Sequence, residues 1–159
     1  MKPEPTSHEL DAVDRALLYH LQRDADLTIQ HLADLVGASA SSVQRRIRRL
    51  VDTKTASHRR VHVDPRRVGF PLSFVAGLQI ERKTEALYAR LKQWMDECEQ
   101  VQACYNVTGD VDFIVIVIAR SIEDYDQLME RMLADNPNVR RFNTHAVLQT
   151  FKSGALVPV

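Results

Sequence analysis

The chain has 159 residues, 45% of them hydrophobic and 26% charged, and its 21 basic and 21 acidic side chains give a formal net charge of zero. This composition is typical of a globular protein with one medium or two small domains, and no apolar run approaches the ~20 residues that span a bilayer. We expect no secretory signal, no membrane association and, with only Cys98 and Cys104, no disulfide framework. The expected location is the cytoplasm.

The positive charge is concentrated in one short segment. Residues 43–67 carry nine basic and two acidic side chains, whereas acidic residues are in excess on both sides of this segment. Such a block suits a polyanionic partner, because each phosphate contact releases counterions. The alternative is a basic helix face that only contacts solvent.

Three short helices are predicted in the first 51 residues. Apolar residues recur at helical spacing from Leu10 to about Leu21, and Thr28 can cap a second helix. Gly37 then predicts a turn, and Ser39 can cap a third helix that runs to Val51. A short helix, a glycine-containing turn and a capped basic helix are typical of a helix-turn-helix, whose second helix fits the major groove.

The third helix has an apolar face and a basic face. Its apolar residues, Val43, Ile47, Leu50 and Val51, follow a 3, 4, 7 spacing and are expected to face the core. The side chains that can then read bases or bind phosphates are Ser39, Ser41, Ser42, Gln44, Arg45, Arg46, Arg48 and Arg49. The alternative is that one or two of these arginines pair with Asp11, Asp14 or Asp34 and are structural.

The segment after this helix predicts a basic β-wing and a connector. Val61 and Val63 alternate with polar residues, and Arg59 and Arg60 add candidate phosphate contacts. We therefore assign residues 1–63 to a winged helix-turn-helix domain and residues 64–70 to a connector.

The remaining pattern predicts a β-α-β-β-α-β order. We expect strands at 72–80, 101–108, 111–119 and 139–149, and helices at 84–99 and from Ser121 to about 133. This order is the ferredoxin-like arrangement, an antiparallel sheet with both helices on one face, so the chain is α+β. We assign residues 71–152 to this domain and 153–159 to a C-terminal tail.

The stretch from Phe113 to Ile118 is apolar at every position. A strand buried on one face only would alternate, so it is either a central strand with incidental outer apolar residues or a strand whose open face is covered by a second copy of the chain. We favour the second interpretation, which makes the protein a homodimer.

Several motifs together resemble the Lrp/AsnC family of transcriptional regulators. They are Leu10-Asp11-x-x-Asp14-Arg15-x-Leu17-Leu18, the run from Leu32 through Gly37, Ser39 and Val43 to Leu50, Asp64-Pro65-x-x-x-Gly69, and Val107-Thr108-Gly109-Asp110-x-Asp112-Phe113. The resemblance covers about residues 10–152. It implies a DNA-binding winged helix-turn-helix joined to an effector-binding, oligomerising ferredoxin-like domain, with dimers that assemble into tetramers or octamers.

One departure from the family pattern lies after the third helix. The family usually has a glycine and two aliphatic residues there, whereas this chain has Asp52-Thr53-Lys54-Thr55-Ala56. We therefore expect this turn to lack a residue with positive φ and to lack the apolar anchor of the wing.

The resemblance places an effector site, for an amino acid, at the turn between the two inner strands. Gly109 lets a ligand approach the backbone, and a carboxylate there can accept from an α-ammonium group. The candidate residues are Tyr105, Thr108, Gly109, Asp110 and Asp112, and we expect Asn143 and Thr144 of the last strand to complete the pocket from a neighbouring subunit. The alternative is a plain hairpin turn with solvated aspartates.

The predicted function is therefore a regulator that binds operator DNA of dyad symmetry and responds to a small effector. The alternative is an enzyme, because some relatives with this layout are sirohaem decarboxylases, but the arginines between Arg45 and Arg49 favour DNA. Spacing of His and Cys residues suggests no metal site, and no catalytic residue or cofactor is predicted.

Overall fold

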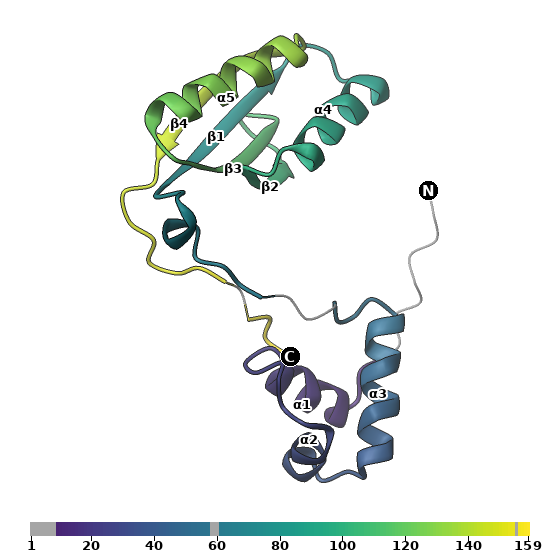
Figure 1. Cartoon of the computed structure of the whole chain (residues 1–159). Helices are drawn as coiled ribbons and strands as arrows, with labels where there is room; N and C mark the ends of the chain where they lie inside the picture. Colours follow the sequence, from purple (N-terminus) through teal and green to yellow (C-terminus); the bar gives the residue numbers. More distant parts are fainter. Residues whose placement is uncertain (1–8, 58–60, 155) are drawn as a thin grey trace. The chain divides into compact units, whose positions relative to one another are not determined.

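A computed structural model describes residues 9–57, 61–154 and 156–159. The chain forms two compact units. One holds the residues up to 61 together with 152–159, and the other holds residues 62–151 (Figure 1). The two units are described separately below.

The first unit is built on three helices, each begun by a polar cap. They are α1 (Ala12–Leu21), α2 (Ile29–Val36) and α3 (Ala40–Asp52). The side chains of Asp11, Thr28 and Ser39 each accept a hydrogen bond from a backbone N–H of the following turn, which satisfies a donor that the helix itself cannot pair. Gly37 ends α2 in the left-handed conformation, with φ of 65°. The three predicted helices and the predicted caps Thr28 and Ser39 are confirmed.

The core of this unit lies where the apolar faces of the helices meet. Leu17, Leu32 and Val43 are fully buried, one from each helix, and Ile47 packs at the edge of the cluster. Burying each of these leucines contributes roughly 1.5–3 kcal/mol. With its apolar residues turned inward, α3 presents its polar residues outward.

The predicted β-wing is absent from the described residues after α3. Residues 53–57 form a turn, residues 61–64 have no regular secondary structure, and Pro65–Val68 form a short 3₁₀ helix capped by Asp64. Arg59 and Arg60 lie outside the described residues. The strand prediction was wrong here because Val61 and Val63 are exposed and find no apolar surface to pack on. The expectation that the turn lacks a positive φ was also wrong, since Lys54 adopts φ of 59°.

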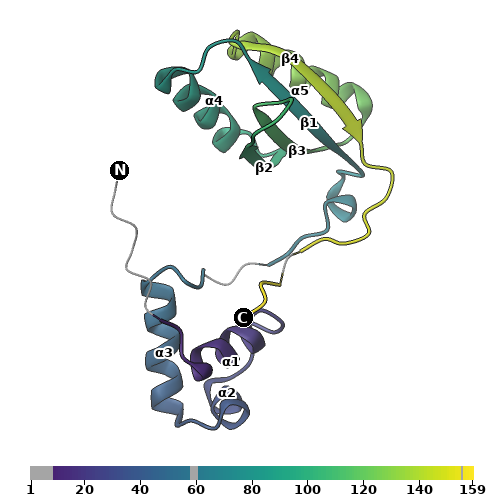
Figure 2. The ribbon, with the colours of Figure 1, turned by 180° about the vertical axis from the view of Figure 1, so that it is seen from behind.

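The second unit is a four-stranded antiparallel sheet. Its strands are β1 (Leu72–Ile80), β2 (Val101–Asn106), β3 (Phe113–Ala119) and β4 (Val139–Ala146), in the order β2-β3-β1-β4 (Figure 2). Two helices, α4 (Glu85–Glu97) and α5 (Ile122–Asp135), complete the predicted β-α-β-β-α-β order. This confirms the ferredoxin-like arrangement.

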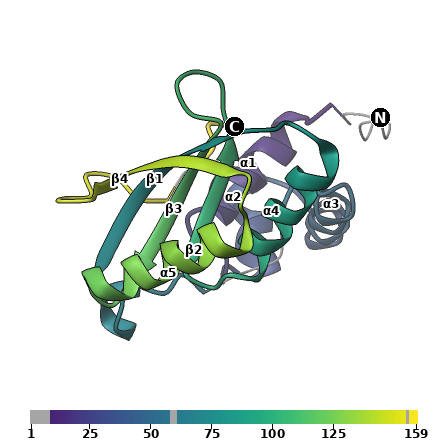
Figure 3. The same ribbon diagram turned by 90° about the horizontal axis from the view of Figure 1, so that it is seen from above.

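Both helices cover the same face of this sheet (Figure 3). Leu91 and Met95 of α4 and Leu128 and Met132 of α5 pack against the alternate strand residues that are buried, such as Val117. Tyr125 stacks on Phe74 with ring centroids 4.0 Å apart. The core of the unit therefore lies entirely between the helices and one sheet face.

The other sheet face carries an apolar stripe that no described residue covers completely. Along β3 the burial alternates, and Ile114, Ile116 and Ile118 are only half-buried. They pair with Gly77, Val75 and Ser73 of β1, so these side chains share the open face. We call Val75, Ile114, Ile116 and Ile118 the open-face stripe.

Candidate nucleic-acid interface and ligand site

The outer face of α3 presents a set of exposed polar side chains. Ser41, Gln44, Arg45 and Arg48 are all exposed, and the guanidinium groups of Arg45 and Arg48 have no hydrogen-bond or ion-pair partner among the described residues. Residues 45 and 48 are one helical turn apart, so they project from one side of the helix. A free arginine can bind a guanine edge or a phosphate, which makes this face a candidate nucleic-acid interface.

Arg46 and Arg49, by contrast, are paired inside the unit. Arg46 contacts Asp14 at 2.8 Å and Asp11 at 2.6 Å, and Arg49 contacts Asp14 at 2.5 Å. The alternative in which two of the four arginines are structural is thus observed for these residues. The sequence contained the signal, because Asp11 and Asp14 belong to the same motif, but it did not show which arginines they bind.

These contacts also shift the pKa values of Arg46 and Asp11. The guanidinium of Arg46 donates hydrogen bonds to Asp11 and Asp14, and both acids raise its pKa. The pKa of Asp11 is lowered, first by the backbone N–H of Asp14 and then by Arg46. At neutral pH these groups are therefore held in their charged forms.

Two of the predicted serines serve the helix end itself. The Ser39 hydroxyl accepts from the Ser42 backbone N–H at 3.3 Å, and it also lies 3.2 Å from the Ser41 hydroxyl. Ser42 is half-buried. Ser41 is thus the serine best placed for an outside partner.

The candidate ligand site is the turn that joins β2 to β3, which extends beyond the sheet in Figure 3. Its base is closed by two main-chain hydrogen bonds. The Val107 N–H donates to the Asp112 carbonyl at 2.9 Å, and the Asp112 N–H donates to the Leu78 carbonyl at 2.8 Å. Between these, Gly109 adopts φ of 118°, a conformation that L side chains rarely tolerate. The backbone N–H groups of residues 108–111 donate to no described residue. They are available to an anionic group such as a carboxylate.

The two aspartates of this turn differ in their surroundings. The Asp112 carboxylate accepts from the Ile80 backbone N–H at 2.9 Å and pairs with Lys83 at 2.6 Å. Lys83 first, and then the Ile80 N–H, lower the pKa of Asp112. The Asp110 carboxylate is exposed and has no partner in the part of the chain that the structure describes. Asp110 is therefore the carboxylate that a cationic ligand group can reach.

The remaining candidate residues do not all meet at the turn. Asn143 lies on the open sheet face, where it and Val111 cover Gly77 so closely that a Cβ there would collide with both. Tyr105 is on the same face but two strands across from Gly77, about 10 Å away at ~4.8 Å per strand. Thr144 points to the helix-covered face, where its hydroxyl bonds to Tyr125 at 2.6 Å. We therefore leave Thr144 out of the site, while Thr108 is exposed within the turn.

Two residues of the turn's surroundings were missed by sequence reasoning. Lys83 follows β1 and pairs with Asp112, and the Gln79 side chain donates to the Asp110 carbonyl. Both are about 30 positions away along the chain. Only the pairing of β1 with β3 brings them to the turn, so no local signal could have found them.

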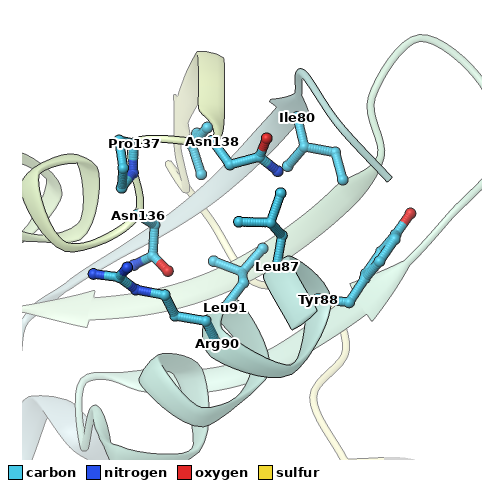
Figure 4. Close-up of a pocket in the computed structure, with 9 residues that line it drawn as sticks. Ile80, Leu87, Tyr88, Arg90, Leu91, Asn136, Pro137 and Asn138 are labelled. Atoms are coloured by element: carbon cyan, nitrogen blue, oxygen red, sulfur yellow. The ribbon is translucent and has the colours of Figure 1, made fainter. Parts of the chain in front are cut away.

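A small hollow lies where β1 ends and β4 begins, beside α4 (Figure 4). Its volume of about 20 Å³ holds about one or two water molecules, too little for an amino acid. The lining is mostly apolar and comprises Ile80, Leu87, Tyr88, Arg90, Leu91, Asn136, Pro137, Asn138 and Val139.

Metal-ligating side chains are not clustered in the part of the chain that the structure describes. The described residues contain no group of three or more His, Cys, Asp or Glu side chains placed to hold a metal ion. None of their helices is both long and apolar enough to cross a membrane.

Two family models match the chain in succession. Residues 10–51 match the AsnC-type helix-turn-helix domain, and residues 73–157 match the Lrp/AsnC ligand binding domain. The first match includes most of α3, and the second includes the turn between β2 and β3.

Known proteins are similar over almost the whole chain. The HTH-type transcriptional regulator y4tD of Sinorhizobium fredii is 34% identical over 151 residues, which cover 95% of this chain and 89% of that protein. The regulator LrpA of Mycobacterium tuberculosis is 33% identical, covering 91% and 93%. Among solved structures, an AsnC family regulator from Agrobacterium tumefaciens superposes with a TM-score of 0.86 at 26% identity, covering 93% of this chain and 96% of that one.

Proposed function

The chain belongs to the Lrp/AsnC family of transcriptional regulators, and from this membership we propose that it binds a double-stranded DNA operator of dyad symmetry as a homodimer. The observation that carries the proposal is the free outer face of α3. There Arg45 and Arg48 have no partner among the described residues and project beside Gln44 and Ser41. Arg46 and Arg49 are left out of the proposed contacts, while Arg59 and Arg60 remain candidates by sequence alone.

We propose that a small effector, an amino acid, binds at the turn between β2 and β3. An amino acid is a zwitterion, so its site needs donors for the carboxylate and an acceptor for the ammonium group. The free N–H groups of residues 108–111 supply the first and the Asp110 carboxylate the second. Asn143 lies beside Val111 and can add an amide contact. The match to a ligand binding domain supports this placement.

The open-face stripe supports the homodimer. Val75, Ile114, Ile116 and Ile118 form a contiguous apolar surface on the sheet face opposite the one that α4 and α5 cover. An apolar surface of this kind is typical of an interface, and a second copy would cover it isologously. A dimer would place two recognition helices in successive major grooves, about 34–36 Å apart. Assembly of dimers into tetramers or octamers is proposed on family membership, as is location in the cytoplasm, where the DNA is.

We propose regulation rather than catalysis. The matched domains are a helix-turn-helix and a ligand binding domain, and the matched relatives are transcriptional regulators. The exposed pair Arg45 and Arg48 suits a polyanion, and decarboxylation of a tetrapyrrole gives no reason for it.

The proposal is tested by recovering genomic DNA fragments on the purified protein at two salt concentrations, with and without a mixture of amino acids. We expect enriched sites of dyad symmetry, a strong loss of binding at the higher salt, and a change in binding when the amino acids are added. Absence of specific enrichment at both salt concentrations would contradict the proposal. Tetrapyrrole binding by the purified chain would then favour the enzyme.

A further inference from the structure

The four arginines of α3 fall into two pairs with opposite environments. Arg45 and Arg48 are exposed and unpaired among the described residues, whereas Arg46 and Arg49 reach back to α1 and its cap. Each pair is spaced by three residues, so each occupies its own side of the helix. The same helix therefore carries two free positive charges and two that are matched by acids.

The acids that match them are Asp11 and Asp14, which we call the acidic clamp. The Asp14 side chain is 1% exposed, and both of its oxygens are used: Oδ1 accepts from Arg46, and Oδ2 accepts from Arg49 and from the Asp11 backbone N–H at 3.3 Å. Asp11 caps α1 and also binds Arg46. Because these bonds interlock, Arg46 cannot turn outward without leaving a buried carboxylate short of a donor.

We propose that the acidic clamp withholds Arg46 and Arg49 from DNA, and thereby sets how strongly the chain prefers its operator over other DNA. This inference rests on the proposed DNA binding by α3. Asp11 and Asp14 would act as positioning residues, because they determine specificity without any contact with DNA.

The physical reason lies in what determines binding to non-operator DNA. That binding depends on how many phosphates the protein neutralises, whereas the preference for an operator comes from the contacts with base edges. Two additional free arginines would strengthen binding to every sequence and add little discrimination. Pairing them with internal acids keeps the background affinity low while Arg45 and Arg48 stay available.

A purely structural role for the clamp predicts a different result. If Asp11 and Asp14 only fasten α3 to α1, their removal loosens the helix and weakens binding to all DNA. If they withhold positive charge, their removal strengthens binding to non-operator DNA and steepens its salt dependence. The slope of log K against log salt separates the two, because it becomes more negative by about 0.9 for each additional phosphate that the protein neutralises.

The experiment uses the full chain with four substitutions, Asp14→Asn, Asp11→Asn, Arg46→Gln and Arg45→Gln. Asp34→Asn is the matched control, because it changes the net charge by the same amount on an exposed acid of α2. Affinity for a scrambled duplex and for an operator-containing duplex is measured by fluorescence anisotropy over a salt series. Circular dichroism melts establish which variants fold.

We expect Asp14→Asn to steepen the slope on scrambled DNA by roughly one to two, and Asp11→Asn by less than one. Arg46→Gln should leave the slope at the wild-type value, whereas Arg45→Gln should make it shallower by about 0.9. Asp34→Asn should leave the slope unchanged.

Two results would overturn the inference. One is a folded Asp14→Asn variant whose slope on scrambled DNA does not steepen. The other is a salt dependence in Arg46→Gln that becomes shallower by as much as in Arg45→Gln. This result decides the question even if Asp14→Asn fails to fold. If neither arginine variant changes the slope while the wild type binds DNA, α3 is not the interface, and the inference fails although DNA binding itself stands. If the wild type binds no DNA at either salt concentration, the proposed function fails as well.

Discussion

The helical unit and the sheet unit both contain neighbouring charged residues of which some serve the fold and others stay free. In the helical unit, Arg46 is held by buried Asp14 while Arg45 projects into solvent. In the sheet unit, the Asp112 carboxylate is held by Lys83, while the Asp110 carboxylate has no partner among the described residues. The first network is centred on the Asp14 side chain, which is 1% exposed, whereas the second lies at the surface, with Lys83 65% exposed. The comparison teaches that a charged residue in a motif can be assigned to a binding site only after its partners within the fold are known.

The two units differ most in the surfaces that they leave exposed. The largest effect that we predict is on dimerisation through the open-face stripe of the sheet unit. Replacing Ile116 by Asp places a charge in the open-face stripe, which the proposed dimer would bury without a partner. We expect the dimer dissociation constant to rise on the order of 100-fold or more, since each 1.4 kcal/mol is tenfold. Analytical ultracentrifugation measures it. The control is Ile122→Asp on the exposed start of α5, and an unchanged dimer in Ile116→Asp would refute the interface.

The contrast between free and paired arginines is sharpened by Arg45→Ala. We expect operator affinity to fall by about 1–3 kcal/mol and discrimination to relax at one position of the operator, because a side chain that contacts a base edge is lost. Binding assays on a panel of operators with single base changes test both. Arg15→Ala, an exposed arginine of α1, is the control. Wild-type affinity in Arg45→Ala would show that another side of α3 faces the DNA.

The equivalent contrast in the sheet unit is between Asp110 and Asp112. Asp110→Asn should weaken amino-acid binding about tenfold, because it removes the charge that accepts the ammonium group, and should leave stability within about 0.5 kcal/mol. Calorimetric titration and thermal melts measure the two quantities. An unchanged affinity for the amino acid that elicits a response would remove Asp110 from the site.

The smallest predicted effect concerns acid stability. Because Lys83 and the Ile80 N–H hold the pKa of Asp112 below its ordinary value of 3.8, its contribution to stability is complete above that pH and is lost as the pH falls through the lowered pKa. Asp112→Asn should therefore be less stable than wild type at pH 7, with the difference shrinking below about pH 4. Denaturant melts at pH 7 and pH 3 provide the comparison. A difference that stays constant between these pH values would contradict this role for the carboxylate.

Much of the fold was predictable because its signals are local. The polar starts at Thr28, Ser39 and Ser121 and the periodicity of the apolar residues located all five α-helices that the structure describes. Strand β1 begins and ends at the predicted residues, 72 and 80. The wing strand was predicted wrongly because alternation alone does not make a strand. A strand also needs a partner and an apolar surface, and Val61 is 90% exposed.

The sequence by itself determined the order of helices and strands, the apolar faces and the concentration of positive charge along α3, because each depends on residues close together in the chain. Only the tertiary structure decided which arginines are free and which aspartate is used. Those answers depend on pairs that are far apart along the chain, such as Asp14 with Arg46 and Lys83 with Asp112. Helix packing and strand register bring such pairs together, and composition and spacing do not record either.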